Sequence, residues 1–249
     1  MSLDAGDEQK HTPPPDPTWC EHFAFDFVDD DGAVAGALQL TFFGGVQPAV
    51  FSACLVRPGR RLLALVDDEL AAPRRLEVRA SGLWVDIECL VPFDHVTVGL
   101  EAFAMELEDP SEALGRMWGE RVPFGLDLEW DTVGSITSWS EPQSARYDIA
   151  CRVHGDVLVG DERIEFDGFG SRRHLWGTPH PWAAPWRRAL TSAGSTVGEM
   201  PIVSVLGKAP LLVRVGAHTF QVDRSLCVVR DARADDATMP AWIERCAPC

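Results

Sequence analysis

The sequence predicts an all-β protein whose antiparallel strands form barrels or sandwiches. Segments with alternating apolar and polar residues recur along much of its 249 residues, and stretches such as PGR, AAP and ASG separate them. Only one segment, PSEALGRMWGE (110–120), has the pattern of a short helix, with Pro110 and Ser111 near its start. Many short strands with regular turns and little helix are typical of antiparallel β architectures.

The first half of the chain is expected to begin with a hairpin. HFAFDFV places Phe23, Phe25 and Phe27 on one face of a strand, and the turn DDDG joins it to AVAGALQLTFF. Further strands are expected at 49–56, 61–68, 74–80, 83–91, 95–108 and 124–133.

A polar connector, GSITSWSEPQSA, precedes a second series of strands. This series opens with a hairpin, RYDIACRVHGDVLVGDERIEFDGFG, which turns at Val-Gly-Asp-Glu, and continues through PIVSVLG, APLLVRVG, HTFQVDR and LCVVRD. The N-terminus is acidic and Pro-rich, as in disordered segments. We therefore expect a disordered leader (1–18), an N-terminal β domain (19–142) and a C-terminal β domain (143–249).

The net charge argues against partners that carry phosphate groups. Lys and Arg total 22 against 38 Asp and Glu, so the formal charge is −16, whereas nucleic acid and anionic membranes require a positive surface. No apolar run approaches the roughly 20 residues of a membrane-spanning helix. We expect a cytoplasmic protein without a nucleic-acid partner or a membrane span, and a homodimer stays open.

The seven cysteines are an odd number, and most lie in apolar strand patterns. In a reducing compartment such residues behave as small hydrophobic side chains. Cys246 and Cys249 have the spacing of a metal or redox pair, but no second pair accompanies them. The sequence therefore predicts neither a metal site nor a cofactor.

The most informative segment is DGFGSRRHLWG (167–177). A strand that buries Ile164 and Phe166 would, with its period of two, also turn Arg172, His174 and Trp176 inward. A bulge at the glycines would reverse this assignment. Without a bulge, the inward Arg172 and His174 would either form hydrogen bonds at the junction between the two β units or face a ligand.

This segment resembles a motif of the carotenoid-hydratase-like (hydroxyneurosporene-synthase-like) proteins. Their pattern Gly-x-Gly-x-Arg-x-His-x-Trp-Gly matches six positions: Gly168, Gly170, Arg172, His174, Trp176 and Gly177. The resemblance covers about thirty residues and implies two lipocalin-like (calycin-type) β-barrel domains. The family commonly has an acid between Arg and His, where this chain has Arg173. That difference puts in doubt any chemistry that depends on the acid.

The resemblance implies a hydrophobic small molecule held inside a barrel. One function is a cofactor-independent hydratase, cyclase or isomerase acting on a polyene, terpenoid or polyketide intermediate. The alternative is a carrier that binds such a molecule without converting it. Protonation of an alkene needs an acid and aromatic walls, whereas a pericyclic step needs a folded substrate and one hydrogen bond to a carbonyl. No nucleotide-binding, zinc or serine-hydrolase motif competes with these functions.

Three groups of residues are candidates for such a site. The catalytic candidates are Arg172, His174 and Tyr147, the only tyrosine, which shares a strand face with Ile149 and Cys151. Each also has a plain structural explanation as a hydrogen-bonded core residue. The ligand-binding candidates are Trp176, Phe166, Trp84 and Trp130. The candidate acids are Glu88, Asp86, Asp127 and Glu129, although carboxylates at i and i+2 more often form a solvated sheet face.

Overall fold

The computed structural model describes residues 3–178 except 32, 46, 58–59 and 109–116. Beyond residue 178 it describes the backbone of six strands: β12 (Trp186–Thr191), β13 (Gly194–Glu199), β14 (Leu212–Val215), β15 (His218–Val222), β16 (Cys227–Asp231) and β17 (Pro240–Cys246). Most of the expected helix 110–120 lies outside the described residues. Its last two residues, Gly119 and Glu120, instead begin a strand.

One large antiparallel sheet contains all the strands before residue 178. These strands are β1 (Cys20–Asp29), β2 (Ala35–Phe43), β3 (Ala49–Val56), β4 (Leu63–Leu70), β5 (Glu77–Ala80), β6 (Leu83–Val91), β7 (His95–Leu107), β8 (Gly119–Thr132), β9 (Thr137–Glu141), β10 (Ser144–Val159) and β11 (Glu162–Gly177). The all-β, antiparallel fold class is confirmed.

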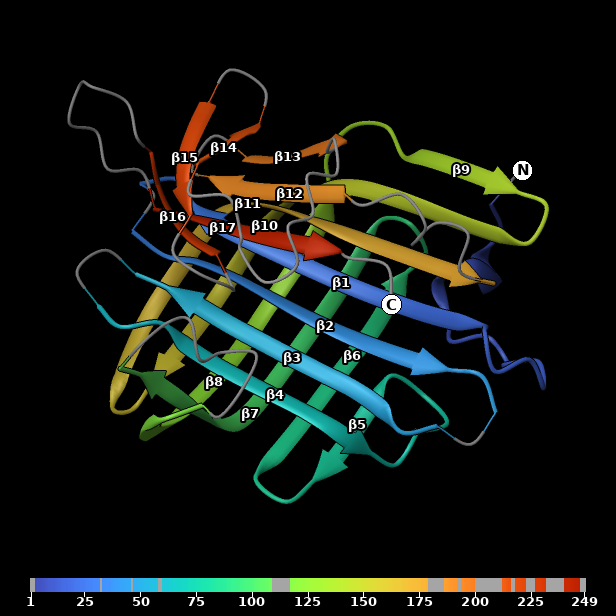
Figure 1. The fold of residues 1–249 in the computed structure, drawn as a ribbon, viewed down its shortest axis with the longest axis horizontal. Coiled ribbons are helices and arrows are strands. Elements are labelled where there is room, and N and C mark those ends of the chain that lie inside the picture. The colour runs from blue at the N-terminus through green and yellow to red at the C-terminus, as the bar shows by residue number, and fades with distance from the viewer. Residues whose placement is uncertain are drawn as a thin grey trace.

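This sheet closes on itself. The hydrogen-bonded order runs β4-β3-β2-β1-β11-β10-β8-β7, and β4 pairs again with β7 through Leu63–Glu106 and Ala64–Met105. Eight strands thus form a ring, which removes the exposed sheet edges that unpaired strands would present. β5 and β6 extend the sheet from β7, and β9 pairs with β10 (Figure 1).

Alternate side chains of the strands point into the interior of the ring. The phenylalanines at 23, 25 and 27 lie on one face of β1 and are nearly inaccessible to solvent, as the alternation in HFAFDFV predicts. They belong to one apolar cluster with Trp130 of β8 and Phe166 of β11. Such burial provides most of the stability of a β-barrel, at roughly 25 cal/mol for each Å² of apolar surface.

Two expected hairpins are present, and the turn of the second is tight. β10 and β11 are joined by Gly160 and Asp161 alone, and Gly160 has a φ of 60°, which favours glycine. The register then continues without a shift from Val159–Glu162 to Ser144–Gly177. The strand period predicted to continue through the glycines is therefore unbroken.

The division of the chain at residue 142 remains a prediction. The strands on either side of it belong to the same sheet, because β10 pairs with β8 and β11 pairs with β1. A second antiparallel sheet, ordered β13-β12-β17-β16-β15-β14, begins only at Trp186 and lies beside β1 to β3 and β11 (Figure 1). Part of the expected connector, 137–141, forms β9. Among the described residues, no helix has the length and apolarity to cross a bilayer.

Residues 4–11, which are part of the leader expected to be disordered, have a defined conformation in the structure. Ala5–Glu8 form a 3₁₀ helix (η1), capped by the side chain of Asp4, which accepts a hydrogen bond from the N–H of Gly6 at 2.7 Å. The segment lies where β1 begins and β11 ends (Figure 1). The polar composition of this segment predicted disorder. In the structure, Glu8 pairs with the buried Arg172 and His11 pairs with the buried Glu21, and these contacts hold the segment against the barrel.

Candidate active site

β11 turns Arg172, His174 and Trp176 toward the ring interior, as the strand period predicts. Arg172 is 3% exposed and His174 is 1% exposed, while Trp176 packs against the apolar cluster. Tyr147 of β10 stands opposite His174 in the register and is also buried. The structure thus brings the three catalytic candidates to one end of the barrel.

The guanidinium of Arg172 meets a carboxylate from the N-terminal segment. Its Nη1 donates to Oε2 of Glu8, and both side chains are almost completely buried. Burial lowers the pKa of Arg172, but the charge and hydrogen bond of Glu8, with further contributions from Tyr147 and Cys151, together outweigh burial and raise the pKa above its usual value. Burial, and then the charge and hydrogen bond of Glu8, raise the pKa of Tyr147 well above its usual value. Both groups therefore remain hydrogen-bond donors.

This ion pair leaves part of the guanidinium without a partner. Among the described residues, Nε and Nη2 of Arg172 and Oε1 of Glu8 are buried and have no hydrogen-bond partner. The thiol of Cys151 lies beside Arg172, but sulfur is a weak acceptor. A buried guanidinium with two free donors is costly unless another oxygen approaches it.

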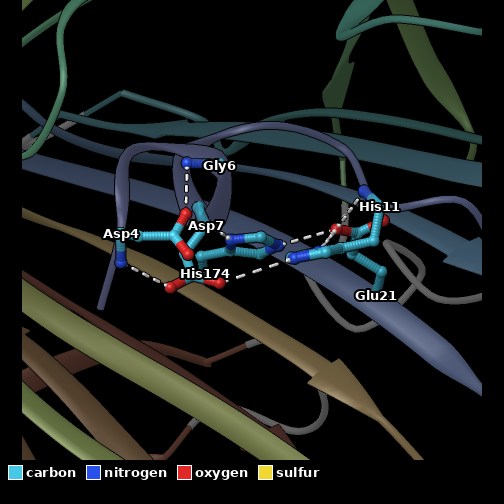
Figure 2. A network of polar contacts seen from close by, with 6 residues as sticks. All are labelled: Asp4, Gly6, Asp7, His11, Glu21 and His174. Carbon is cyan, nitrogen blue, oxygen red and sulfur yellow. Dashed lines mark hydrogen bonds and ion pairs between the residues drawn. The ribbon is translucent and has the colours of Figure 1, made fainter. Parts of the chain in front are cut away.

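His174 takes part in a second polar cluster, in which Glu21 joins two histidines (Figure 2). Oε1 of Glu21 lies 2.9 Å from Nε2 of His174 and 2.7 Å from Nδ1 of His11. The other nitrogen of His174 lies 2.7 Å from the carbonyl oxygen of Asp7. Glu21 also accepts a hydrogen bond from the backbone N–H of His11.

These contacts shift two pKa values in opposite directions. Burial raises the pKa of Glu21, but hydrogen bonds from His11 and His174 outweigh burial and lower it below its usual value. Burial lowers the pKa of His11, but the hydrogen bond and charge of Glu21 raise it overall. The cluster therefore favours an ionised Glu21 beside a protonated His11.

Aromatic rings surround the cluster. Phe23 stacks on His174 with ring centres 3.9 Å apart, and Trp176 lies 4.6 Å from His174 and 4.8 Å from His11. Tyr147 meets His174 edge to face at 5.6 Å. These contacts fix the imidazole of His174 and leave it little freedom to turn toward Arg172.

The position between Arg172 and His174 has a different role. Arg173 points to the opposite face of β11, where it is buried and donates to the carboxylate of Asp148 on the neighbouring strand. An acid at position 173 would therefore not reach Arg172 and His174 from inside the barrel. The acids that do reach them are Glu8 and Glu21.

The other candidates fall into two groups. Phe166 and Trp130 lie inside the barrel; Phe166 packs edge to face on Phe27 at 5.2 Å, and Trp130 donates its indole N–H to the carbonyl of Asp26. The remaining candidates lie on the outer face of β6 or β8 and are not brought to Arg172: Trp84, Asp86, Glu88, Asp127 and Glu129. Trp84 instead lines an open groove of about 550 Å³ with Phe103 and Phe124.

Glu8, His11 and Glu21 belong to the site, although they were not predicted from the sequence. For Glu21 a signal was present, because the alternation of Phe23, Phe25 and Phe27 extends back to it and places its carboxylate on the buried face. For Glu8 and His11 no local signal existed. Glu8 meets Arg172 across 164 residues of chain, and its surroundings in the sequence are polar.

The fold and site define an antiparallel β-barrel with ionisable groups buried at one end. The chain belongs to a family described as a domain of unknown function, DUF7064, whose model matches residues 4–197. No curated protein matches it.

Three solved structures align with most of this chain. A protein provisionally named AttH from Nitrosomonas europaea is 12% identical over 93% of both chains, with a TM-score of 0.52. Kievitone hydratase from Nectria haematococca is 8% identical over 94% of this chain and 90% of its own, with a TM-score of 0.49. CghA with Sch210972 is 13% identical over 92% of this chain and 58% of its own, with a TM-score of 0.40. At 12% identity, the similarity to the Nitrosomonas europaea protein concerns the fold and not the activity.

Proposed function

We propose that this protein is a cofactor-independent cyclase, isomerase or hydratase that acts on a hydrophobic polyene, terpenoid or polyketide intermediate. The observation that carries the proposal is the buried guanidinium of Arg172, which retains two unpartnered donors among the described residues inside an aromatic-lined barrel. A carbonyl or hydroxyl oxygen of a ligand would satisfy these donors, while its apolar body would contact the barrel wall.

The donor character of the site favours cyclisation or isomerisation over hydration. Arg172 keeps its charge and Tyr147 keeps its proton, so both can stabilise negative charge that develops on a carbonyl oxygen. Protonation of an isolated alkene would need a strong acid instead, and Glu8 is already the counter-ion of Arg172. In this proposal His174 is a positioning residue, because it holds Tyr147 and Trp176 through ring contacts.

The alternative is a carrier that holds the same kind of molecule without converting it. It is favoured by the N-terminal segment, which closes one end of the barrel through Glu8 and Arg172. In the free protein Glu8 is paired with Arg172, and an oxygen atom of the ligand would take the place of Glu8. Binding alone requires no further chemistry from these residues.

Two measurements test the proposal. Native mass spectrometry of the protein recovered from an extract of its source should show a bound hydrophobic molecule. That molecule is then incubated with the wild type and with Tyr147→Phe, which removes one hydroxyl and preserves the ring. Conversion by the wild type, and at least tenfold slower conversion by the variant, supports the enzyme.

Two results would contradict the enzyme. Recovery of the bound molecule unchanged after incubation with the wild type would establish the carrier. Equal rates for the wild type and Tyr147→Phe would remove Tyr147 from the reaction. If the protein binds neither the extracted molecule nor a fluorescent polyene, both functions are wrong.

A further inference from the structure

We propose that His11, Glu21 and His174 form a binding site for one divalent transition-metal ion, with Zn²⁺ the best match. Their donor atoms all lie within 4.8 Å of one another. Two imidazole nitrogens and one carboxylate oxygen are a donor set that zinc commonly takes, with water in the remaining position. This site goes beyond the proposed function, whose chemistry at Arg172 and Tyr147 needs no metal.

The distances allow an ion after the side chains adjust. Nδ1 of His11 and Nε2 of His174 lie 2.7 and 2.9 Å from Oε1 of Glu21, and all three donor atoms lie within 4.8 Å of one another. In a tetrahedral site with bonds of about 2.0 Å, the donors are separated by about 3.3 Å. The two contacts with Glu21 therefore need to lengthen by about half an ångström, and the two imidazole nitrogens need to move closer together. His11 lies near the end of the N-terminal segment, and its side chain is 29% exposed, so it can move and gives the ion a path.

The groups that contact the three proposed ligands are also typical of a metal site. Histidines that bind a metal nearly always donate their second N–H to a carboxylate or a backbone carbonyl. Here both histidines face Asp7: Nδ1 of His174 lies 2.7 Å from its carbonyl oxygen, and Nε2 of His11 lies 3.7 Å from its carboxylate (Figure 2). The carboxylate of Glu21 is held by the backbone N–H of His11 at 2.9 and 3.2 Å.

The contacts of His174 suit a metal ligand. Its Nδ1 lies 2.7 Å from the carbonyl oxygen of Asp7, to which a ring N–H can donate. With an ion bound, His174 would keep this hydrogen bond and present the lone pair of Nε2 to the metal.

The choice of ion follows from the ligands. Imidazole nitrogen suits Zn²⁺, Cu²⁺, Ni²⁺ and Fe²⁺, whereas Mg²⁺ and Ca²⁺ prefer oxygen. The position of the site indicates its role, because the ion would join the N-terminal segment, through His11, to β1 and β11, through Glu21 and His174. A bound ion would therefore fasten the segment that covers Arg172.

The first experiment measures metal binding by the whole protein. The chain is freed of metal with a chelator, and Zn²⁺ is added in a titration calorimeter, with the melting temperature followed in parallel. We expect one Zn²⁺ ion to bind at the site formed by His11, Glu21 and His174. We also expect the melting temperature to rise with zinc concentration. His11→Ala and Glu21→Gln should each weaken that binding at least tenfold and abolish the rise.

Two control variants exclude other sites. His154→Ala removes a histidine that is paired with Asp131 on the outer face, and should leave zinc binding unchanged. Cys249→Ser removes one member of the C-terminal cysteine pair and should also leave the His11-dependent ion in place. Loss of that ion in either control would overturn the proposal.

A second measurement needs no variant. Co²⁺ replaces Zn²⁺ in many proteins, and its visible absorption reports coordination geometry. An intense visible band is expected when Co²⁺ is added to the metal-free wild type, and Zn²⁺ should remove it. Absence of both zinc binding and the cobalt band in the wild type would show that this cluster holds protons and not a metal.

Discussion

At the scale of single residues, the decisive pair is Arg172 and Glu8. The two side chains are almost completely buried and form an ion pair across 164 residues of sequence. Breaking such a pair on one side leaves an uncompensated charge in an apolar interior, whereas removing both charges does not. The pair is therefore sensitive to single substitutions in a way that an exposed pair is not.

A double-mutant cycle tests this coupling. Arg172→Met should lower the free energy of unfolding by about 3–5 kcal/mol, because Glu8 is then buried alone. Adding Glu8→Gln should recover much of the loss, so the two effects are strongly non-additive. Urea unfolding measures each value. As a control, Arg57→Met breaks the more exposed pair with Glu162 and should cost no more than about 1 kcal/mol. Additive effects at Arg172 and Glu8 would contradict the coupling.

The inward direction of Arg172 and His174 could be predicted from the sequence, but their partners could not. The period of two from Phe166 fixes which face of β11 they share, and the register confirms it. The partners Glu8 and Glu21 lie more than 150 residues away along the chain. Contacts of this kind depend on how strands are ordered in the ring, which local patterns do not encode.

At the scale of elements, the glycines of β11 explain the Gly-x-Gly part of its motif. A Cβ at Gly170 would lie 2.0 Å from the carbonyl oxygen of Asp26 on β1, and one at Gly168 would lie 2.0 Å from that of Val28. Glycine therefore allows the two backbones to approach closely next to Arg172. The motif serves the packing of β1 on β11 as well as any ligand.

Gly170→Ala should separate these strands and lower the free energy of unfolding by about 1–3 kcal/mol, because the added carbon overlaps backbone that cannot rotate away. Chemical denaturation of both proteins measures the loss. Gly125→Ala is the matched control, since the nearest atoms there are 3.2 Å away, and it should cost less. If both variants lose the same free energy of unfolding, the close approach of β1 and β11 does not explain why position 170 is glycine.

A cross-strand cluster on the outer face makes stability depend on pH. Asp131 of β8 accepts hydrogen bonds from His95 of β7 at 2.7 Å and from His154 of β10 at 2.9 Å. Burial raises the pKa of Asp131, but these hydrogen bonds and the charges of the histidines outweigh it and lower the pKa. A carboxyl whose pKa is lowered by folding stabilises the protein above its unfolded pKa, and loses this effect as pH falls through the folded value.

Asp131→Asn should therefore be less stable than the wild type at pH 5 to 6, and the difference should shrink below about pH 4. The side chain of Asp131 is 44% exposed, so we expect a difference no larger than about 1 kcal/mol. Thermal unfolding of both proteins between pH 3 and pH 6 measures it. A difference that stays constant across this range would exclude the carboxylate as its source.

At the scale of the whole molecule, the ring has a weak point in its closure. β10 and β11 pair along sixteen residues each, from Ser144–Gly177 to Val159–Glu162. For β4 and β7 the described register consists of Leu63–Glu106 and Ala64–Met105. Local opening costs less free energy where few backbone hydrogen bonds and contacts must break. The seam between β4 and β7 is therefore the side of the barrel where opening requires the least energy.

Hydrogen exchange followed by mass spectrometry tests this difference. Amides of β4 and of the β7 residues near Met105 should exchange faster than those in the middle of β10 and β11, because opening the seam breaks the shortest pairing in the ring. A ligand that fills the interior binds the closed barrel, so its addition should slow exchange at the seam more than elsewhere. A polyene found by native mass spectrometry is the probe for this comparison. Equal exchange on both sides of the ring would show that the barrel opens as one unit, and would place ligand entry at an end of the barrel instead.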